Sequence, residues 1–392
     1  MLRFLTAGES HGPLLTGILE GLPAGLPLTS ADVDTDLLRR QQGYGRGGRM
    51  SIEKDHVRFA SGVVAGQTTG GPITLLVENR DYKNWSEKTI DPMTVPRPGH
   101  ADLTGAVKYG YRELRLSLER ASARETTMRV AVGAICKKLL AEFGIRVQGY
   151  VTAIGEVIAE LPDTEDYISR FEAAEASEVR CPDPVATERM HEVIHDAIQA
   201  KDTLGGIIEV VALGVPPGLG SHVHYDRKLD GQLMGAVGSI HAMKGVEIGR
   251  AFDQALMPGT KVHDAITVEN GELHRRTNHA GGLEGGITTG EPIVVRAAMK
   301  PIATTLYPLD SVDLASGEPK LTDYERSDFC AVPRAVVVVE AMVAIVLAGA
   351  LLEKLGGDSL DELRPRFAAL RRNRLEDLPM DNLPWQFNYE YA

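Results

Sequence analysis

The chain has 392 residues, of which 43% are hydrophobic, so it can bury a large core. Only 5% of its residues are aromatic and its formal net charge is −12 at pH 7, a composition that argues against both single-strand and duplex nucleic-acid binders. The three cysteines are widely spaced without a metal-type pairing, and the N-terminus has no apolar signal region, so we expect reduced thiols in a cytoplasmic protein.

The first 80 residues alternate short apolar runs with glycine-rich turns. This pattern predicts strands over residues 2–6, 14–19, 57–64 and 73–78. Thr29 or Ser30 caps a predicted helix that ends at Gln42. Basic residues are concentrated in this part of the chain at Arg39, Arg40, Arg46, Arg49, Lys54 and Arg58. An acidic protein with such a local basic cluster is typical of an enzyme that binds small anions.

A buried helix is predicted over residues 123–143. Ser122 and Glu125 form the pattern of a capping box, and apolar residues follow at helical spacing to a stop at Gly144. Three arginines surround the predicted N-terminus: Arg120, Arg124 and Arg129. Unpaired backbone N–H groups and the helix dipole favour an anion there, so the site suits phosphate. The alternative is that Ser122 only caps the helix, while the arginines pair with Glu119 and Glu125.

Three segments of the first half return in the second half in the same order. Residues 21–26 match 214–219, residues 68–73 match 288–293, and residues 139–144 match 351–356. We therefore predict that residues 1–145 and 205–357 are two copies of one strand–helix–strands–helix unit, with 146–204 as an insertion and 379–392 as a C-terminal tail. Chance resemblance between glycine-rich turns is the alternative.

The helices predicted over residues 123–143 and 333–355 are apolar over most of their surface, so we expect both between sheets. The predicted fold class is α+β: a single domain over residues 1–392, internally duplicated, with two antiparallel sheets sandwiching a helical layer and a catalytic cleft where the copies meet. Residues 335–352 are nearly long enough to span a bilayer. Because this segment contains Glu340, we expect a buried core helix instead.

Residues 191–195 (HEVIH) fit the zinc motif H-E-x-x-H, in which a helix places both histidines on one side. They lie in a helix predicted over residues 184–201, at the edge of its apolar stripe. No third histidine follows at the spacing of the commonest extended motif. We therefore favour a solvated pair of histidines, His191 and His195, and no metal, although a distant carboxylate ligand would complete a site.

Residues 8–12 (GESHG) fit the pattern of a hydrolase nucleophile elbow, but an elbow needs a helix after it and a strand is predicted here. The alternative is that the glycines bring the backbone close to a ligand, while His11 donates a proton and Ser10 orients it. His100 lies in a loop fixed by prolines and a glycine. It is a candidate proton donor, or a structural residue bonded to Asp102.

Asp328 lies between Arg326 and Arg334, just before the second apolar helix, and is a candidate base or simply part of an ion pair. The sequence has neither a dinucleotide-binding glycine fingerprint after a strand nor a Walker-type lysine loop. A nucleotide cofactor held by a standard fingerprint is therefore not expected. A phosphate-bearing cofactor held by scattered arginines, serines and threonines stays open.

Seven motifs together carry a resemblance that spacing alone could not supply. They are residues 8–12 (GESHG), 39–47 (RRQQGYGRG), 97–102 (RPGHAD), 120–126 (RASARET), 244–249 (KGVEIG), 278–282 (NHAGG) and 326–330 (RSDFC). The set resembles the chorismate synthase family over about residues 3–355, and no single unrelated family shares it.

The resemblance implies a reaction in which 5-enolpyruvylshikimate 3-phosphate loses phosphate and a ring proton by 1,4-anti elimination. The product is chorismate, and this is the last step of the shikimate pathway in aromatic amino-acid biosynthesis. The family requires reduced FMN without net redox change. For this chain the resemblance implies NADPH as an indirect reductant, an external flavin reductase, a homotetramer, and neither nucleic acid nor membrane as a partner.

The same resemblance assigns roles to individual residues. His11 is the acid that protonates the departing phosphate, and His100 protonates or steadies the reduced flavin. Asp328 assists removal of the ring proton, while Ser10 and Ser122 support the proton relay. The implied substrate-binding residues are His11, Arg40, Arg46, Arg49, Arg124 and Arg334.

Cofactor binding carries over in the same way. Arg40 and Arg46 match the family's phosphate-binding and nicotinamide-nucleotide arginines. The positions that match its flavin contacts are Arg120, Ala121, Ser122, His241, Ala242, Gly285, Lys300, Pro301, Ile302, Ala303, Thr304 and Arg326. Many members have serine at the position of Ala121, and an amide is common at that of His241, so two flavin contacts depart from the family pattern.

Two other classes of protein remain open. A zinc hydrolase would centre on His191 and His195. A non-catalytic phosphate or nucleic-acid binder would centre on the basic segment 39–58, with strongly salt-dependent binding.

Overall fold

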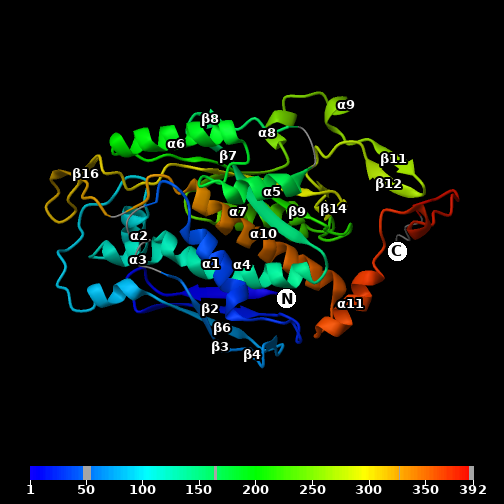
Figure 1. Ribbon diagram of the computed structural model, residues 1–392, viewed down its shortest axis with the longest axis horizontal. Coiled ribbons are helices and arrows are strands. Elements are labelled where there is room, and N and C mark those ends of the chain that lie inside the picture. Colours follow the sequence, from blue (N-terminus) through cyan, green and yellow to red (C-terminus); the bar gives the residue numbers. More distant parts are fainter. Residues whose placement is uncertain (47–53, 163–165, 326, 388–392) are drawn as a thin grey trace, which may run out of the picture.

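The computed structural model describes residues 1–46, 54–162, 166–325 and 327–387, and it contains both helices and strands (Figure 1). The strands are β1 (Arg3–Ala7), β2 (Leu14–Glu20), β3 (Val57–Ser61), β4 (Val63–Val64), β5 (Gln67–Thr68), β6 (Ile73–Glu78), β7 (Arg146–Ile154), β8 (Val157–Ile158), β9 (Gly206–Leu213), β10 (Met243–Ile248), β11 (Ile266–Glu269), β12 (Glu272–Arg275), β13 (Leu283–Glu284), β14 (Ile287–Thr288), β15 (Ile293–Met299), β16 (Asp310–Val312) and β17 (Pro319–Leu321). The helices are α1 (Ser30–Gln41), α2 (Asp102–Tyr109), α3 (Arg115–Ala121), α4 (Thr126–Ala141), α5 (Tyr167–Ala176), α6 (Pro184–Gln199), α7 (Leu229–Gly238), α8 (Ala251–Gln254), α9 (Gly259–Val262), α10 (Val332–Leu355) and α11 (Leu360–Ala368).

Two larger sheets organise the chain. A four-stranded sheet has the order β1-β2-β6-β3, and a five-stranded sheet has the order β10-β15-β9-β7-β8. Every neighbouring pair of strands in both is antiparallel. The four strands expected in the first 80 residues are confirmed, except that a break at Gly62 divides the third into β3 and β4.

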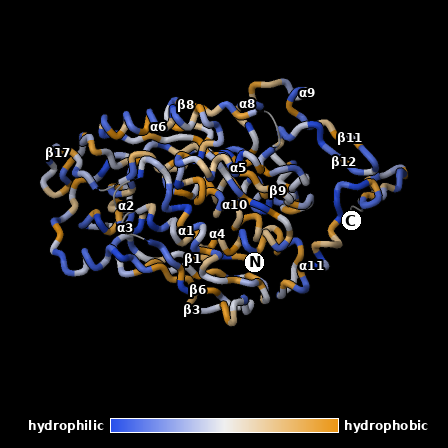
Figure 2. Tube along the Cα trace, viewed as in Figure 1, coloured by the Kyte–Doolittle hydropathy of each residue, from blue (hydrophilic) through white to orange (hydrophobic). Residues whose placement is uncertain are grey.

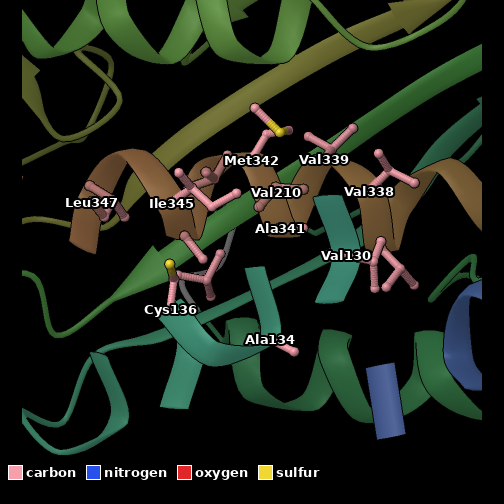
Figure 3. Close-up of a cluster of buried hydrophobic side chains, with 14 of the residues drawn as sticks. Val130, Ala134, Cys136, Val210, Val338, Val339, Ala341, Met342, Ile345 and Leu347 are labelled. Atoms are coloured by element: carbon pink, nitrogen blue, oxygen red, sulfur yellow. The ribbon is translucent and has the colours of Figure 1, made fainter. Parts of the chain in front are cut away.

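Helices α4 and α10 cross in the middle of the molecule. In Figure 1, α4 lies next to the blue four-stranded sheet, and α10 lies next to the green strands of the five-stranded sheet. Figure 3 shows their apolar side chains meeting one another, with Val130 of α4 beside Val338 of α10, and Val210 of β9 close to α10. The helices predicted over residues 123–143 and 333–355 are therefore confirmed as buried helices.

The two helices approach most closely at Gly133 of α4. A Cβ atom on this glycine would lie 2.3 Å from the Cβ of Ala341 and 2.5 Å from its Cα. Carbon atoms that are not bonded to each other, directly or through one shared atom, cannot come this close. Glycine at this position is therefore what lets α4 and α10 touch backbone to backbone.

One buried charge lies inside this apolar layer. Glu340 of α10 is fully buried, and its Oε2 accepts hydrogen bonds from Arg39 Nη1 of α1 at 2.7 Å and from Lys137 Nζ of α4 at 2.5 Å. Its Oε1 accepts one from the backbone N–H of Gly149 in β7 at 2.9 Å. Burial raises the pKa of Glu340, but the charges of Arg39 and Lys137 outweigh burial and lower it to about 2.

Helix α10 is the most apolar long segment, seen as a continuous hydrophobic stretch in the interior of Figure 2. In the part of the chain that the structure describes, α10 is the only helix long and apolar enough to span a membrane. However, 83% of its most apolar 18-residue stretch is buried inside the protein. This burial confirms the predicted core helix.

The start of α4 differs from the predicted capping box. Ser122 caps the short 3-10 turn η3 (Ala123–Glu125), where its Oγ accepts a hydrogen bond from the backbone N–H of Arg124 at 3.3 Å. Glu125 does not reach back to Ser122, because its carboxylate bonds to Thr6 of β1 and Arg129 of α4 instead. The capping box is formed at α1, where Asp32 and Thr29 bond reciprocally.

Candidate active site

A cavity of about 810 Å³ opens where α4 and α10 begin. Its wall is made by the loop between β1 and β2, the segment before α2, the end of α3, the start of β10, the end of β15 and the first turns of α10. The sequence-predicted residues that line it are Ser10, His11, Arg40, His100, Ala121, Ser122, Arg124, His241, Ala242, Lys300, Ile302, Ala303, Thr304, Asp328 and Arg334. Seven segments that are distant in sequence therefore supply one site.

His11 is held by a carboxylate from α3. Its Nδ1 lies 2.7 Å from Glu119 Oε1, and its backbone N–H donates to Glu119 Oε2 at 2.7 Å. The Trp85 ring packs against the imidazole with ring centroids 4.2 Å apart. The loop needs Gly8 because a Cβ atom there would lie 2.6 Å from the carbonyl oxygen of Leu14, at a φ of +109°.

His100 has a different carboxylate partner. Its Nδ1 lies 2.6 Å from Asp102 Oδ1, and Asp102 also accepts from Arg97 Nε at 2.8 Å. Arg97 continues to Thr304 Oγ1 at 2.9 Å, so the side chains lock together. Burial raises the pKa of Asp102, but hydrogen bonds from His100 and Arg97 keep it well below its ordinary value. The suggested bond between His100 and Asp102 is confirmed.

The two serines proposed for a proton relay meet in this cavity. Ser122 Oγ donates to Ser10 Oγ at 3.1 Å, and Ser10 is almost completely buried. Ser10 directly precedes His11 in the chain, and both serines line the same cavity as His11. Hydroxyl groups can both donate and accept, which is what a proton relay needs.

Three arginines bring positive charge to one wall of the cavity. Arg40 is buried, with its Nε donating to Thr126 Oγ1 at 3.1 Å. Its Nη1 lies 3.6 Å from Asp55 Oδ2, and no atom of the described residues hydrogen-bonds to that nitrogen. Burial and the neighbouring charges of Arg334 and Arg124 lower the pKa of Arg40. An anion bound here would relieve that repulsion.

Asp328 forms an ion pair with Arg334, whose Nε also donates to the backbone carbonyl of Arg40 at 3.1 Å. The carboxylate is therefore held at the cavity wall beside the arginine cluster. The ion pair suggested from the sequence is present, and Asp328 lines the cavity. Its role as a base stays a prediction. Arg326, its other sequence neighbour, lies outside the described residues.

Another part of the cavity lining is made by residues that the resemblance assigns to the flavin. Nδ1 of His241 is buried and has no hydrogen-bond partner among the described residues. Burial lowers the pKa of the His241 imidazole. Ala242 has a left-handed backbone at φ +65°, which is unusual for a residue with a Cβ. Its carbonyl accepts from the N–H of Lys300 at 3.0 Å, which joins the two flavin-assigned segments.

Four predicted site residues lie away from the cavity lining. Arg46 lines a second cavity of about 570 Å³ beside Glu175 and Arg180. Arg120 points to β1, where its Nη2 donates to the carbonyl of Thr6 at 2.9 Å. The other two are Gly285, in the turn between β13 and β14, and Pro301. Their binding roles stay predictions, and Arg49 lies outside the described residues.

The phosphate site predicted at the start of α4 is only partly supported. Arg129 pairs with Glu125, as the alternative reading expected, with Nε and Oε2 2.9 Å apart. Glu119 binds His11 rather than an arginine. Arg124 is the one of the three arginines that lines the cavity, and its Nη1 donates to Asp55 Oδ1 at 2.7 Å.

Sequence reasoning missed several residues of this site. Trp85 and Asp55 had no assigned role, and Glu119 appeared only as an alternative partner of the arginines. Arg97 and Lys244 appeared only within their motifs. Arg97 could have been found, since it lies three and five residues before His100 and Asp102. Glu119 could not, because its partner is 108 residues away.

His191 and His195 lie on α6, as predicted, but apart from this cavity. His191 packs on Tyr44 with ring centroids 4.4 Å apart, and its Nε2 lies 3.9 Å from Glu178 Oε2. His195 is exposed. Within the described residues no group of three or more His, Cys, Asp or Glu side chains is placed to hold a metal ion.

Comparison with known proteins agrees with the motifs. The model of the family described as chorismate synthase matches residues 2–352. The chain is 56% identical over 380 residues to the chorismate synthase of Trichlorobacter lovleyi, covering 93% of this chain and 97% of that protein. It is 55% identical over 377 residues to that of Bacillus cytotoxicus, with coverage of 93% and 97%.

A solved structure described as a crystal structure of chorismate synthase is also similar. It superposes with a TM-score of 0.77 at 46% sequence identity, covering 94% of this chain and 96% of that one. The family resemblance seen in the seven motifs is thereby confirmed over nearly the whole chain. The chain belongs to the chorismate synthase family.

Proposed function

We propose that the protein is a lyase that forms chorismate from 5-enolpyruvylshikimate 3-phosphate by 1,4-anti elimination of phosphate and a ring proton, the last step of the shikimate pathway. The observation that carries this proposal is the pairing of two carboxylate-bound histidines with three arginines around one cavity. A substrate with two carboxylates and a phosphate needs several cations, and guanidinium groups bind such anions in fixed directions.

The acid–base groups divide the reaction between them. His11 gives a proton to the departing phosphate, because a histidine is an efficient general acid near neutral pH. Asp328, held by Arg334, takes up the proton that leaves the ring. Ser122 and Ser10, in hydrogen-bond contact, return protons between solvent and His11. Arg40, Arg124 and Arg334 bind the anionic groups, with Arg46 and Arg49 as further expected substrate contacts.

The family implies a flavin, and the cavity fits one together with a small substrate. A volume of about 810 Å³ is near the upper end of the range for small-molecule sites. The orphaned Nδ1 of His241 and the neighbouring amides of Ala242 and Ala303 offer polar contacts to a planar ring. Residues proposed to hold it as reduced FMN are Arg120, Ala121, Ser122, His241, Ala242, Gly285, Lys300, Pro301, Ile302, Ala303, Thr304 and Arg326.

When bound, reduced FMN supplies transient electron donation that side chains cannot provide. His100 is fixed by Asp102 and Arg97, Arg97 also bonds to Thr304, and Lys300 bonds to the carbonyl of Gly99. These contacts support the proposal that His100 would protonate the flavin or steady its charge. We propose that NADPH, through an external flavin reductase, is the indirect source of the electrons.

The decisive assay is anaerobic. Purified protein, dithionite-reduced FMN and 5-enolpyruvylshikimate 3-phosphate should yield chorismate and phosphate in equal amounts, and oxidised FMN should yield neither. His11→Ala should lower turnover at least about 100-fold, since a positioned general acid contributes at least that much. Phosphate release without chorismate would contradict the proposal.

We further propose that residues 1–392 form one internally duplicated domain, a sandwich of two sheets around a helical layer. Two turns support duplication. Thr68 Oγ1 accepts from the N–H of Leu26 at 3.0 Å and donates to Pro23, and Thr288 Oγ1 accepts from the N–H of Leu219 at 2.8 Å and donates to Pro216. The order β1-β2-β6-β3 also parallels β7-β9-β15-β10, so β7 of the predicted insertion corresponds to β1.

The remaining proposals concern the setting of the enzyme. We propose a cytoplasmic homotetramer that acts on a small molecule, without a metal and without nucleic-acid or membrane partners. Support for assembly comes from large apolar side chains that are exposed, including Phe252, Leu256, Trp385 and Phe387.

A further inference from the structure

Glu119 is a half-buried carboxylate of α3 to which the proposed mechanism gives no role. We propose that Glu119 is a positioning residue that fixes the ring of His11 through Nδ1 and stabilises its protonated form, so that Nε2 presents the proton to the leaving phosphate. This inference rests on the proposed function, in which His11 is the acid.

The geometry is that of a built contact. Glu119 uses both oxygens on one residue, Oε1 on the ring Nδ1 and Oε2 on the backbone N–H of His11, each at 2.7 Å. Its own backbone carbonyl accepts from the N–H of Ser10 at 3.1 Å. The side chains of His11 and Glu119 are 16% and 14% exposed. One of these hydrogen bonds holds the ring and the other two hold the backbone of Ser10 and His11. Because the contact is largely shielded from water, the imidazole has little freedom to turn.

Occupation of Nδ1 decides which nitrogen can act. A neutral imidazole has one donor and one acceptor nitrogen, and a carboxylate selects the form with the proton on the nitrogen that it faces. Because Nδ1 faces Glu119, we infer that His11 exchanges a proton with the ligand through Nε2. The same carboxylate stabilises the imidazolium that must exist before the proton is given.

Comparison with the other histidine sharpens the assignment. Asp102 accepts from the backbone N–H, Nε and Nη2 of Arg97 as well as facing His100, so its charge is shared with a guanidinium. Glu119 receives its two side-chain bonds from His11. Burial raises the pKa of Glu119, but these bonds outweigh burial and lower it, so the carboxylate is charged.

Other charged groups around the ring come from several elements. Asp81 of η2 (Arg80–Asn84) accepts from Trp85 Nε1 at 3.3 Å, and Lys88 Nζ and Arg115 Cζ lie 5.4 and 5.9 Å from the Trp85 ring. Further charged groups are Glu9 in the same loop and, across the cavity, His100, Arg40, Arg124 and Arg334. Their mixed signs make a direct test of the Glu119 contribution necessary.

Trp85 supplies a reporter that does not depend on turnover. It packs on His11, and a protonated imidazole quenches indole emission more strongly than a neutral one. The chain has two tryptophans, and Trp385 is 74% exposed on the tail, so Trp385→Phe leaves Trp85 as the single emitter. In this background the emission of ligand-free protein is followed against pH, with His11→Ala identifying the step that belongs to the histidine.

We expect Glu119→Gln to move that step to lower pH by about 1 unit or more, because an opposite charge within hydrogen-bond distance has been removed. In the anaerobic assay its kcat should fall about 10- to 100-fold, as for other outer partners of functional histidines, with KM changed less than about threefold. Glu119→Asp should restore part of both, since it keeps the charge. The matched control is Glu87→Gln, which removes an exposed carboxylate two residues from Trp85.

An unchanged fluorescence step in Glu119→Gln would overturn the inference, even if activity were lost, because Glu119 would then only support the loop. If Glu119→Gln does not fold, as judged by circular dichroism, Glu119→Asp must itself show a shifted step and a lowered kcat, or the inference fails. Loss of the chorismate activity from the parent protein would refute the proposed function alone. The titration would still decide whether Glu119 and His11 are coupled.

Discussion

At the scale of single residues, the cavity concentrates positive charge before any ligand arrives. The guanidinium of Arg40 is buried next to Arg124 and Arg334, with Asp55 and Asp328 as the carboxylates nearby. Like charges held together in a buried place cost free energy. Part of that cost is recovered when an anion binds, so the charges of the cavity favour a polyanionic ligand.

Arg40→Ala should raise the KM for the phosphorylated substrate strongly, since truncating one partner of a buried charged contact costs about 2–5 kcal/mol. Arg40→Lys is the matched variant: it keeps the charge but lacks the planar fork, so its KM should lie between those of the parent and Arg40→Ala. Steady-state kinetics under anaerobic conditions measures both. Equal KM values for parent and Arg40→Ala would show that the substrate binds elsewhere.

Residue pairs could be predicted from the sequence only when they are close in it. Asp102 lies two residues from His100 and Arg334 six from Asp328, so both pairs could be proposed in advance. The Glu119–His11 contact joins α3 to the loop after β1, and Arg40–Asp55 joins two segments around α1. Such contacts depend on how whole elements pack, which local pattern does not specify.

At the scale of elements, the crossing of α4 and α10 fixes the positions of both helix starts, and these form the cavity wall. The two apolar helices could be predicted from composition alone. The close approach at Gly133 could not, because a glycine within a helix has no pattern that reveals its partner. The predicted capping box at the start of α4 was also wrong, because Glu125 bonds to Thr6 and Arg129 and not to Ser122.

Gly133→Ala should lower the free energy of unfolding by about 1–3 kcal/mol or more, because the added methyl would collide with Ala341. Urea unfolding followed by circular dichroism measures the change. The matched control is Gly235→Ala in α7, where nothing lies within 4 Å of the added Cβ. That variant should be neutral or stabilised by about 0.5–1 kcal/mol, as expected for alanine in a helix. Equal effects of the two substitutions would refute the close approach.

Glu340→Gln should lower the free energy of unfolding at pH 7 by about 1.5–3 kcal/mol, because the fully buried carboxylate loses its charge-assisted hydrogen bonds to Arg39 and Lys137. Both cations keep Asp36 as a counter-charge, which limits the loss. The exposed residue Glu353 of the same helix provides the control, and Glu353→Gln should change little.

The contribution of the Glu340 charge to the free energy of unfolding should also depend on pH. Its pKa is lowered from 4.5 to about 2 by folding, so its charge stabilises the native state fully above pH 4.5. Below that pH the unfolded chain takes up the proton first, and the contribution disappears as the pH falls toward 2. Unfolding curves of parent and Glu340→Gln should therefore converge between pH 4.5 and 2, and a constant difference would contradict the assignment.

At the scale of the whole molecule, the C-terminal tail exposes several large apolar side chains. The described part of the tail leaves Met380, Leu383, Trp385 and Phe387 at least 70% exposed. The segment before the tail is attached to β12 through hydrogen bonds from Leu273 to Asn373 and from Leu375 to Gly271. An apolar surface of this kind is typical of a contact with another protein.

Deletion of residues 379–392 should weaken the proposed tetramer. Light scattering after size exclusion should give four times the chain mass of 42.4 kDa for the parent, and smaller species on dilution for the deletion. A variant that carries Glu87→Gln alone controls for handling. A tetramer of unchanged stability would exclude the tail from the contact.

The position of α10 in the chain has a consequence for how the protein is made. This helix supplies the middle of the core, yet it begins at residue 332, after both large sheets have been synthesised. Until it leaves the ribosome, the inner faces of those sheets and of α4 have no permanent cover. The core of the nascent chain therefore cannot close until residues 332–355 have been synthesised, and until then the chain depends on chaperones or on fast synthesis to avoid aggregation.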